Sequence, residues 1–197
     1  NLQGKMNDNV VLRSVFKDMT LTSNVTIDDL VINDVKLGKA KFGFNNMLSK
    51  NEFAADIRMS YNEPNSGQII PLSIKGRVNL ADKNDNLDLK VDMQEFDIRI
   101  IENYLSSLSS YVRGKISAEN LLVKGKFTQP HIAGSLKIKD GAMKIDMLNT
   151  TYSFNDELFV NDNIFTMDNF VLQDAQKNKI TINGTITHDN FTNFDLN

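Results

Sequence analysis

Apolar and polar residues alternate along most of this chain, which is the pattern of β-strands with one buried and one solvated face. The alternation is clearest at residues 53–61, 70–80, 87–93 and 180–187. In the first run, for example, Phe53, Ala55 and Ile57 share one face, and Ala54 and Asp56 share the other. Turn-rich segments rich in Asn and Asp separate the runs, so we predict an antiparallel meander.

The segment 125–145 combines the same alternation with an Asp140-Gly141 pair. Asp-Gly is the strongest short-range signal for a two-residue type I′ turn, which needs positive φ at both central positions. This signal predicts a hairpin in which Ile138 lies opposite Met143 and Leu136 lies opposite Ile145. All four side chains then share one face, while the lysines of the segment fall on the other face.

One segment departs from the alternation. Between residues 100 and 108, apolar residues are spaced i, i+1, i+4, i+5 and i+8, as on one side of a helix. We therefore predict one short helix near residues 100–109, packed on an end or an edge of the sheet. A structural plug over apolar side chains is the simpler role for it, and a gate for a ligand is the alternative.

Glycines interrupt the predicted strands at Gly114, Gly125, Gly134 and Gly184. Such positions mark bulges and strong coiling of a sheet. The predicted fold class is therefore all-β: a curved, mostly antiparallel sheet that forms an open trough, or half-barrel, with one short helix. We divide it into a β-meander at 1–95 and a second β region at 96–197.

Composition narrows the function classes. The chain has 197 residues, with 41% hydrophobic and 24% charged residues, which suits one all-β domain or two small ones. The net charge is −3, and the basic residues are scattered, so no nucleic-acid partner is expected. The chain lacks cysteine and has no apolar run of membrane-spanning length. Because it begins without methionine and stops within an alternating run, we interpret it as a fragment of a longer protein.

Residues with catalytic chemistry are sparse. The two histidines, His131 and His188, lie in different predicted strands without neighbours at metal-ligand spacing. The segment 82–86 begins like a calcium loop, but Leu87 and Met93 stand where the loop needs glycine and a bidentate glutamate. A plain turn explains this segment better. We therefore predict no enzymatic activity, no metal site and no cofactor.

From Phe96 onward the chain resembles the TamB family of the translocation and assembly module, within the AsmA-like, bridge-type lipid carriers of diderm bacteria. The resemblance rests on the order and spacing of several motifs and covers about half of the chain. The motifs are the strand-plus-helix lead-in 96–105, Val112-Arg113-Gly114-Lys115-Ile116, 122–127, 130–136, the Asp140-Gly141 pair, 182–188 and 191–196. The last two look like the version found in Bacteroidetes-type members.

The resemblance implies a periplasmic part of a longer, inner-membrane-anchored protein. Its hydrophobic groove would conduct phospholipid toward the outer membrane, assist outer-membrane protein assembly through a barrel partner of the translocation and assembly module type, or both. The phospholipid acyl chains are the implied ligand. Strand parity assigns one apolar surface to Val112, Ile116, Ile132, Leu136, Ile138, Met143, Ile145, Ile180, Ile182 and Ile186. The alternative is a closed β-sandwich that acts as an adhesin or structural interaction module, in which these side chains bury one another.

Overall fold

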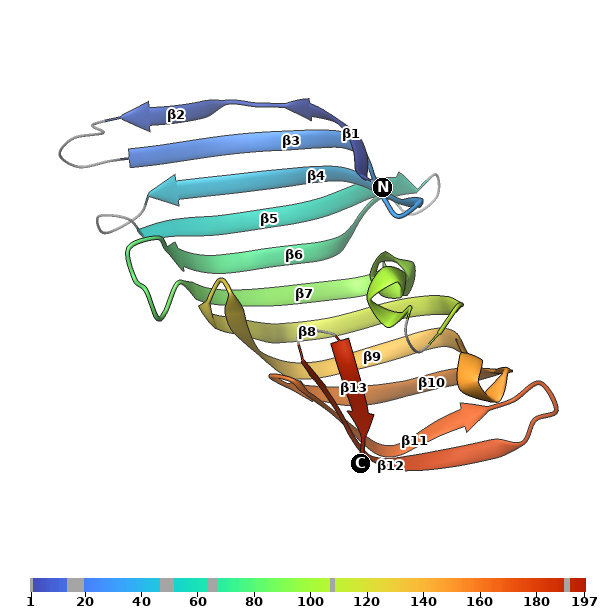
Figure 1. Cartoon of the computed structure of the whole chain (residues 1–197). Coiled ribbons are helices and arrows are strands. Elements are labelled where there is room, and N and C mark those ends of the chain that lie inside the picture. Colours follow the sequence, from blue (N-terminus) through green and yellow to red (C-terminus); the bar gives the residue numbers. More distant parts are fainter. Residues whose placement is uncertain (1, 14–19, 47–51, 64–66, 107–108, 190–191) are drawn as a thin grey trace. The chain divides into compact units, whose positions relative to one another are not determined.

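The computed structural model describes residues 2–13, 20–46, 52–63, 67–106, 109–189 and 192–197 (Figure 1). Its strands belong to one sheet in the order β1-β3-β4-β5-β6-β7-β8-β9-β10-β11-β12-β13, and β2 pairs with β3. Neighbours in the sheet are therefore almost always neighbours in the sequence. The pairs from β1–β3 to β6–β7, and from β9–β10 to β12–β13, are antiparallel. Among the described residues, β1 and β13 end this order without pairing to each other.

These observations confirm the predicted fold class: the chain is all-β, mainly antiparallel, and open rather than closed into a barrel. The short helix is also present, as the 3₁₀ segment η1 at Ile98–Leu105. It begins two residues before the predicted start and ends at Leu105, so that Ser109 of the predicted range is not helical. Residues 107 and 108 of the predicted helix lie outside the described residues.

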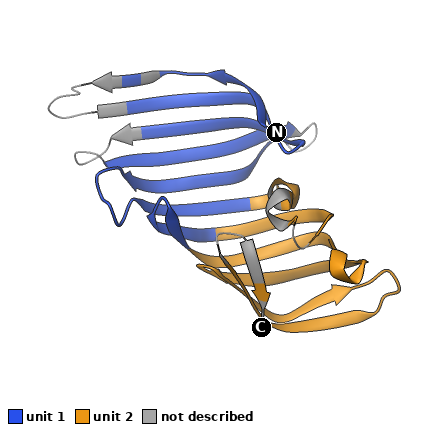
Figure 2. Cartoon of the chain, viewed as in Figure 1, with its two compact units in different colours: residues 1–93, 120–131 blue, residues 94–119, 132–197 orange. Residues whose placement is uncertain are grey.

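The chain divides into two compact units (Figure 2). Unit 1 comprises residues 1–93 and 120–131, and unit 2 comprises residues 94–119 and 132–197. The sequence-based division at residue 95 differs from these units, because the end of β8 and the start of β9, residues 120–131, belong to unit 1.

Unit 1 holds β1 (Leu2–Asn7), β2 (Val10–Arg13), β3 (Thr20–Ile32), β4 (Val35–Asn46), β5 (Glu52–Glu63), β6 (Gly67–Asn79) and the greater part of β7 (Leu87–Asp97). Unit 2 holds η1, parts of β8 and β9, and the later elements. These are β8 (Val112–Lys126), β9 (Gln129–Ile145), η2 (Asp146–Leu148), β10 (Thr150–Asn161), β11 (Ile164–Gln173), β12 (Lys179–Asp189) and β13 (Thr192–Leu196).

Unit 1 buries its apolar side chains on one face of the sheet. Phe53 pairs with Val78 across β5 and β6 and is only 2% exposed. Ala55, Val78 and Leu87 form a buried cluster, against which Phe44, Leu89 and Val123 pack. The period-two pattern thus placed Phe53, Ala55, Val78 and Leu87 on apolar faces that are buried, whereas Ile70 and Leu80 of the same pattern are exposed.

The predicted hairpin at Asp140-Gly141 is wrong. Strand β9 continues through both residues to Ile145 and pairs with β10 along its length: Leu136 with Leu158, and Ile138 with Asp156. The register shifts at this point, because two residues of β9, Lys139 and Asp140, lie opposite Asn155 alone. Asp140 has φ 51°, so the Asp-Gly pair forms a β-bulge instead of a turn.

This bulge belongs to a recurring feature that we call the bulge clip: an amide N–H of a left-handed, non-glycine strand residue donates to a side-chain oxygen of a neighbouring strand. Four left-handed residues within strands carry one. The donor–acceptor pairs are Glu95–Ser117 at 3.1 Å, Asn120–Asp92 at 2.8 Å, Asp140–Asn155 at 2.6 Å and Asn169–Asn183 at 2.6 Å. The amide left without a ladder partner by the irregularity is satisfied in this way.

We expect Asn155→Ala to lower the free energy of unfolding by about 1 kcal/mol, because it removes the acceptor for the Asp140 amide. Urea unfolding followed by far-UV circular dichroism measures this loss. Asn155→Asp is the matched control, since a carboxylate accepts the same hydrogen bond. If the alanine variant unfolds at the same urea concentration as the aspartate variant, the clip does not stabilise the bulge.

Candidate functional site

The strand ladder of unit 2 collects apolar side chains on one face, which we call the apolar face. Directly paired residues point to the same side of a sheet. Across β9 and β10, Leu136 pairs with Leu158, and Met143 pairs with Tyr152. The next strands continue the face, because Leu158 pairs with Met167, which in turn pairs with Gly184 on β12.

The apolar face continues across the bulges, although at each bulge it passes from even-numbered to odd-numbered residues or the reverse. In β9 the apolar face carries the even-numbered Leu136 and Ile138 before the bulge, and the odd-numbered Met143 and Ile145 after it. Strand β11 changes phase in the same way. Its register shifts between Met167 and Phe170, with the left-handed Asn169 in between.

The ten residues assigned by strand parity all lie in unit 2. Those of β9 are placed together by the β10 ladder, apart from Ile132, which follows by alternation from Gly134. On β12, Ile180, Ile182 and Ile186 pair with Leu172, Phe170 and Phe165. Val112 and Ile116 lie on either side of Gly114, whose side-chain position faces Gly141 of β9 at 2.9 Å. The ladder thus places the residues of β9 that pair with β10 on one face, together with those of β12. The place of Val112 and Ile116 on that face and the contact of all ten residues with lipid stay predictions.

Parity reasoning did not name the aromatic part of this face. Tyr152 and Phe154 on β10 and Phe170 on β11 are all buried, and the Phe154 and Phe170 rings lie 5.5 Å apart. The alternation Tyr152, Phe154, Asp156, Leu158, Val160 was present in the sequence, but the aspartate in its centre interrupted the apolar pattern.

Exposure differs along the apolar face. Val112 is 1% exposed and Ile138 is 9% exposed, whereas Leu136, Met143 and Ile182 are half-buried and Ile180 is 45% exposed. All described strands belong to one sheet, so the described residues do not form a sandwich of two separate sheets. Part of the apolar face of unit 2 is therefore accessible to solvent in the described chain.

Asp156 is the one acidic side chain that the ladder places on this face in β9 to β12, among the described residues. Its carboxylate accepts hydrogen bonds from two main-chain amides, those of Glu157 and Val171, both at 2.9 Å. The Val171 amide follows the β11 bulge. Asp156 is thus engaged with the backbone of the bulge, which explains how an acidic residue is tolerated among apolar neighbours.

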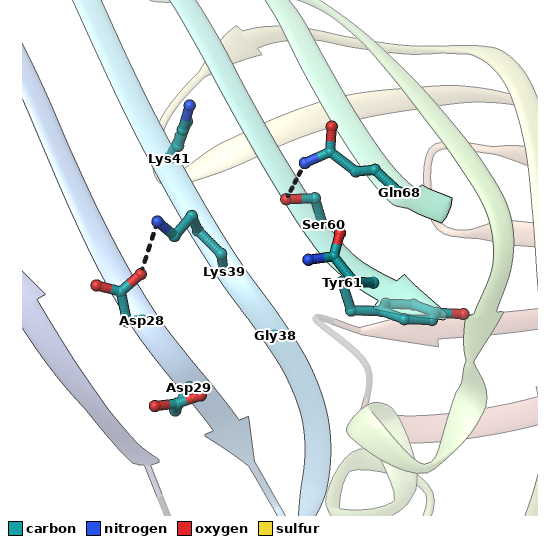
Figure 3. A pocket seen from close by; sticks show the side chains of 9 residues that line it. Asp28, Asp29, Gly38, Lys39, Lys41, Ser60, Tyr61 and Gln68 are labelled. Atoms are coloured by element: carbon teal, nitrogen blue, oxygen red, sulfur yellow. Dashed lines mark hydrogen bonds and ion pairs between the residues drawn. The ribbon is translucent and has the colours of Figure 1, made fainter. Parts of the chain in front are cut away.

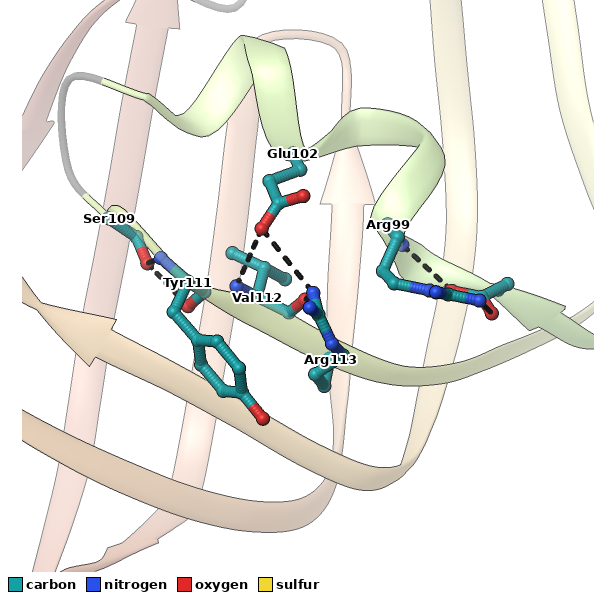
Figure 4. A network of polar contacts seen from close by, with 7 residues as sticks. Arg99, Glu102, Ser109, Tyr111, Val112 and Arg113 are labelled. Carbon is teal, nitrogen blue, oxygen red and sulfur yellow. Dashed lines mark hydrogen bonds and ion pairs between the residues drawn. The ribbon is translucent and has the colours of Figure 1, made fainter. Parts of the chain in front are cut away.

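The segment η1 is fastened beside the start of β8 (Figure 4). The carboxylate of Glu102 accepts hydrogen bonds from the Val112 amide at 3.3 Å and from the Arg113 guanidinium at 3.4 Å. Arg113 also lies over the Tyr111 ring, 4.7 Å from its centre. These contacts are what a fixed structural element requires, and the gate role considered for this segment stays a hypothesis.

Asp97 begins η1 and caps it. Its side chain accepts hydrogen bonds from the Arg99 amide at 3.0 Å and from the Arg99 guanidinium at 2.7 Å. Burial alone would raise the pKa of Asp97, but the Arg99 hydrogen bonds and the nearby Lys115 charge outweigh it, so this pKa lies below its ordinary value. The carboxylate is therefore charged at neutral pH and serves as a structural anchor.

Unit 1 has a polar pocket of about 480 Å³ (Figure 3). Its lining residues are Asp28, Asp29, Gly38, Lys39, Lys41, Ser60, Tyr61, Asn62 and Gln68. Lys39 pairs with Asp28 at 2.9 Å, and Gln68 donates to the Ser60 hydroxyl at 3.3 Å. The sequence analysis did not identify this pocket, because its residues come from separate strands and form no motif.

The segment 82–86 and the two histidines were the remaining candidates from the sequence. The Asp82 carboxylate accepts hydrogen bonds from the amides of Asn84 and Asp85, which hold the pKa of Asp82 below its ordinary value and make the segment a turn. His188 is buried at the end of β12, with its ring 5.0 Å from the Phe165 ring. His131 is exposed on β9.

No group of three or more His, Cys, Asp or Glu residues in the described part of the chain has the arrangement of a metal site. No helix there has the length and apolar character needed to cross a membrane.

Comparison with protein-family models, with curated proteins and with solved structures finds no match to this chain.

Proposed function

We propose that the apolar face of unit 2 binds the acyl chains of phospholipids, and that the chain is part of a TamB-like protein. Such a protein would lie in the periplasm as part of a longer, inner-membrane-anchored chain. It would conduct phospholipid toward the outer membrane, assist outer-membrane protein assembly with a barrel partner, or both. The resemblance of residues 96–197 supplies the family, and the accessible apolar face is the observation that carries the proposal.

The composition of the face suits acyl chains. Aliphatic and aromatic residues from β9 to β12 lie side by side through the ladder, and the acidic Asp156 is engaged with main-chain amides. A hydrocarbon chain that leaves a membrane for this face exchanges one apolar environment for another. The cost of about 0.8 kcal/mol per CH₂ that water would impose is then largely avoided.

Mechanistically, this is partition without a chemical step. The half-buried residues Leu136, Met143 and Ile182 would contact the acyl chain, and the lysines of the opposite face keep that side of the sheet solvated. Because no single polar group selects the ligand, we expect broad tolerance of acyl-chain length.

A photo-crosslinking amino acid at position 136 tests the proposal. Leu136 lies on the apolar face, and the adjacent Lys137 points to the opposite face, so a crosslinker at 137 is the matched control. In the presence of phospholipid vesicles we expect lipid adducts at 136 and none at 137, as detected by mass spectrometry. Equal labelling at both positions would show unspecific contact.

Leu136→Arg separates the conduit from a closed structural module. On an open face the arginine reaches water, so the variant should melt near the wild-type temperature and still lose lipid transfer, because a charge in the apolar path costs several kcal/mol. In a closed module the same change should unfold the protein. A wild type without lipid adducts, together with an unfolded Leu136→Arg variant, would favour the adhesin or structural module.

A further inference from the structure

We infer that the η2 segment inserts into the surface of a phospholipid bilayer and brings the apolar face to its lipid source. This inference rests on the proposed function, since it names the surface from which the face would be filled. We call Asp146–Asn149, which connects β9 to β10, the η2 tip. Met147 is 90% exposed there and Leu148 is 52% exposed.

Three hydrogen bonds fix the conformation of the η2 tip. The Asn149 amide donates to the Asp146 carbonyl at 3.0 Å, and the Thr150 hydroxyl donates to the Leu148 carbonyl at 2.9 Å. The Ser110 hydroxyl donates to the Asp146 carboxylate at 2.6 Å. Met147 and Leu148 are the apolar side chains that the tip exposes, beside the exposed Asp146 and Asn149.

The tip adjoins the apolar face. Met143 and Ile145 lie at the end of β9 on that face, and Ile145 pairs with Thr150 directly across the tip. Tyr111 lies alongside, because its carbonyl accepts a hydrogen bond from the Lys144 amide at 3.0 Å. Tyr111 is 38% exposed, and the Arg113 guanidinium lies over its ring. A tyrosine with an arginine beside it is typical of protein surfaces at the membrane–water interface.

The charges near the tip favour a bilayer with zwitterionic headgroups. Lys144 lies 4.0 Å from Asp146, and Arg113 lies 3.4 Å from Glu102, so each cation has a carboxylate close by. The local charge is balanced, and binding should therefore depend on apolar insertion more than on anionic lipid.

The size of the patch favours a bilayer over a protein partner. A stable protein interface buries about 800 Å² on each partner, which two or three projecting side chains do not supply. Insertion into a bilayer needs no such area, because each buried apolar side chain contributes separately. The expected binding is weak and reversible.

The whole chain lacks tryptophan, so a single tryptophan is a clean probe. In Met147→Trp we expect a blue-shifted emission on addition of phosphatidylcholine vesicles, and quenching by phosphatidylcholine with brominated acyl chains. Phe159→Trp is the matched control, because Phe159 is 50% exposed on β10, on the side of the strand opposite Leu158. No shift at 147, or an equal shift at 159, would overturn the inference.

Loss of binding is tested with Met147→Asp and Leu148→Asp, each of which should lower vesicle co-sedimentation about tenfold or more while the circular dichroism spectrum stays unchanged. Unchanged co-sedimentation would overturn the inference. So would a blue shift of Met147→Trp that follows protein concentration without vesicles, because the tip would then bind a second copy. Lipid adducts at 136 without insertion at 147 would contradict only the insertion of the η2 tip. Insertion at 147 without adducts at 136 would contradict only the binding of acyl chains by the apolar face.

Discussion

Replacing Phe53 with alanine should lower the free energy of unfolding by about 3 to 5 kcal/mol. Phe53 is 2% exposed and is among the largest fully buried side chains of the described residues. It pairs with Val78 on β6, next to the cluster of Ala55, Val78 and Leu87. Alanine would leave a cavity that the rigid sheet on either side cannot close.

Urea unfolding followed by circular dichroism measures this effect. Phe127→Ala is the matched control in the same unit, because Phe127 lies at the turn between β8 and β9 and is 50% exposed. Its removal should cost much less. If both variants lose the same free energy, Phe53 does not hold the core of unit 1.

Gly141→Val should destabilise unit 2 by about 1 to 3 kcal/mol, through overpacking. A Cβ atom at residue 141 would lie 2.4 Å from the Phe154 ring and 2.8 Å from the Phe154 carbonyl oxygen. Gly114 approaches from β8, where a Cβ would lie 2.9 Å from the Gly141 Cα atom. The Phe154 ring occupies the space that a side chain at residue 141 would need.

This destabilisation comes from packing. In the predicted hairpin it would have come from the positive φ that a type I′ turn requires at Gly141. The left-handed residue is Asp140, and Gly141 is needed for its lack of a side chain. Ala142→Val is the control, since it adds the same side chain one residue later on the other face. Thermal melting should show a clear loss for Gly141→Val alone, and equal melting temperatures would contradict the packing argument.

The alternation of apolar and polar residues predicted the strands, and the helical spacing of apolar residues at 100–108 predicted the short helix, because the period of apolar residues reports burial directly. It also placed Leu136, Ile138, Met143 and Ile145 on one face, although the hairpin that led to this conclusion is wrong. A type I′ turn and a bulge at Asp140 both shift the phase of the alternation by one residue. The alternation and the Asp-Gly pair therefore do not distinguish a hairpin turn from a bulge.

The recurrence of the bulges offers a signal that sequence reasoning missed. The left-handed residues Asp29, Glu95, Asn120 and Asn169 each follow another polar residue and precede an apolar one. Two polar residues in a row, the second of them acidic or asparagine, mark these phase shifts. The polar pocket of unit 1 had no such signal, because it depends on which strands become neighbours.

The strand order has a consequence for how such a chain could evolve. Because neighbours in the sheet are almost always neighbours in the sequence, each hairpin brings its own pairing partner. Duplication or loss of one hairpin would lengthen or shorten the sheet by two strands without rearranging the others, as in solenoid proteins. The local pairing also predicts fast, stepwise zipping during folding, with each new strand added to an existing edge.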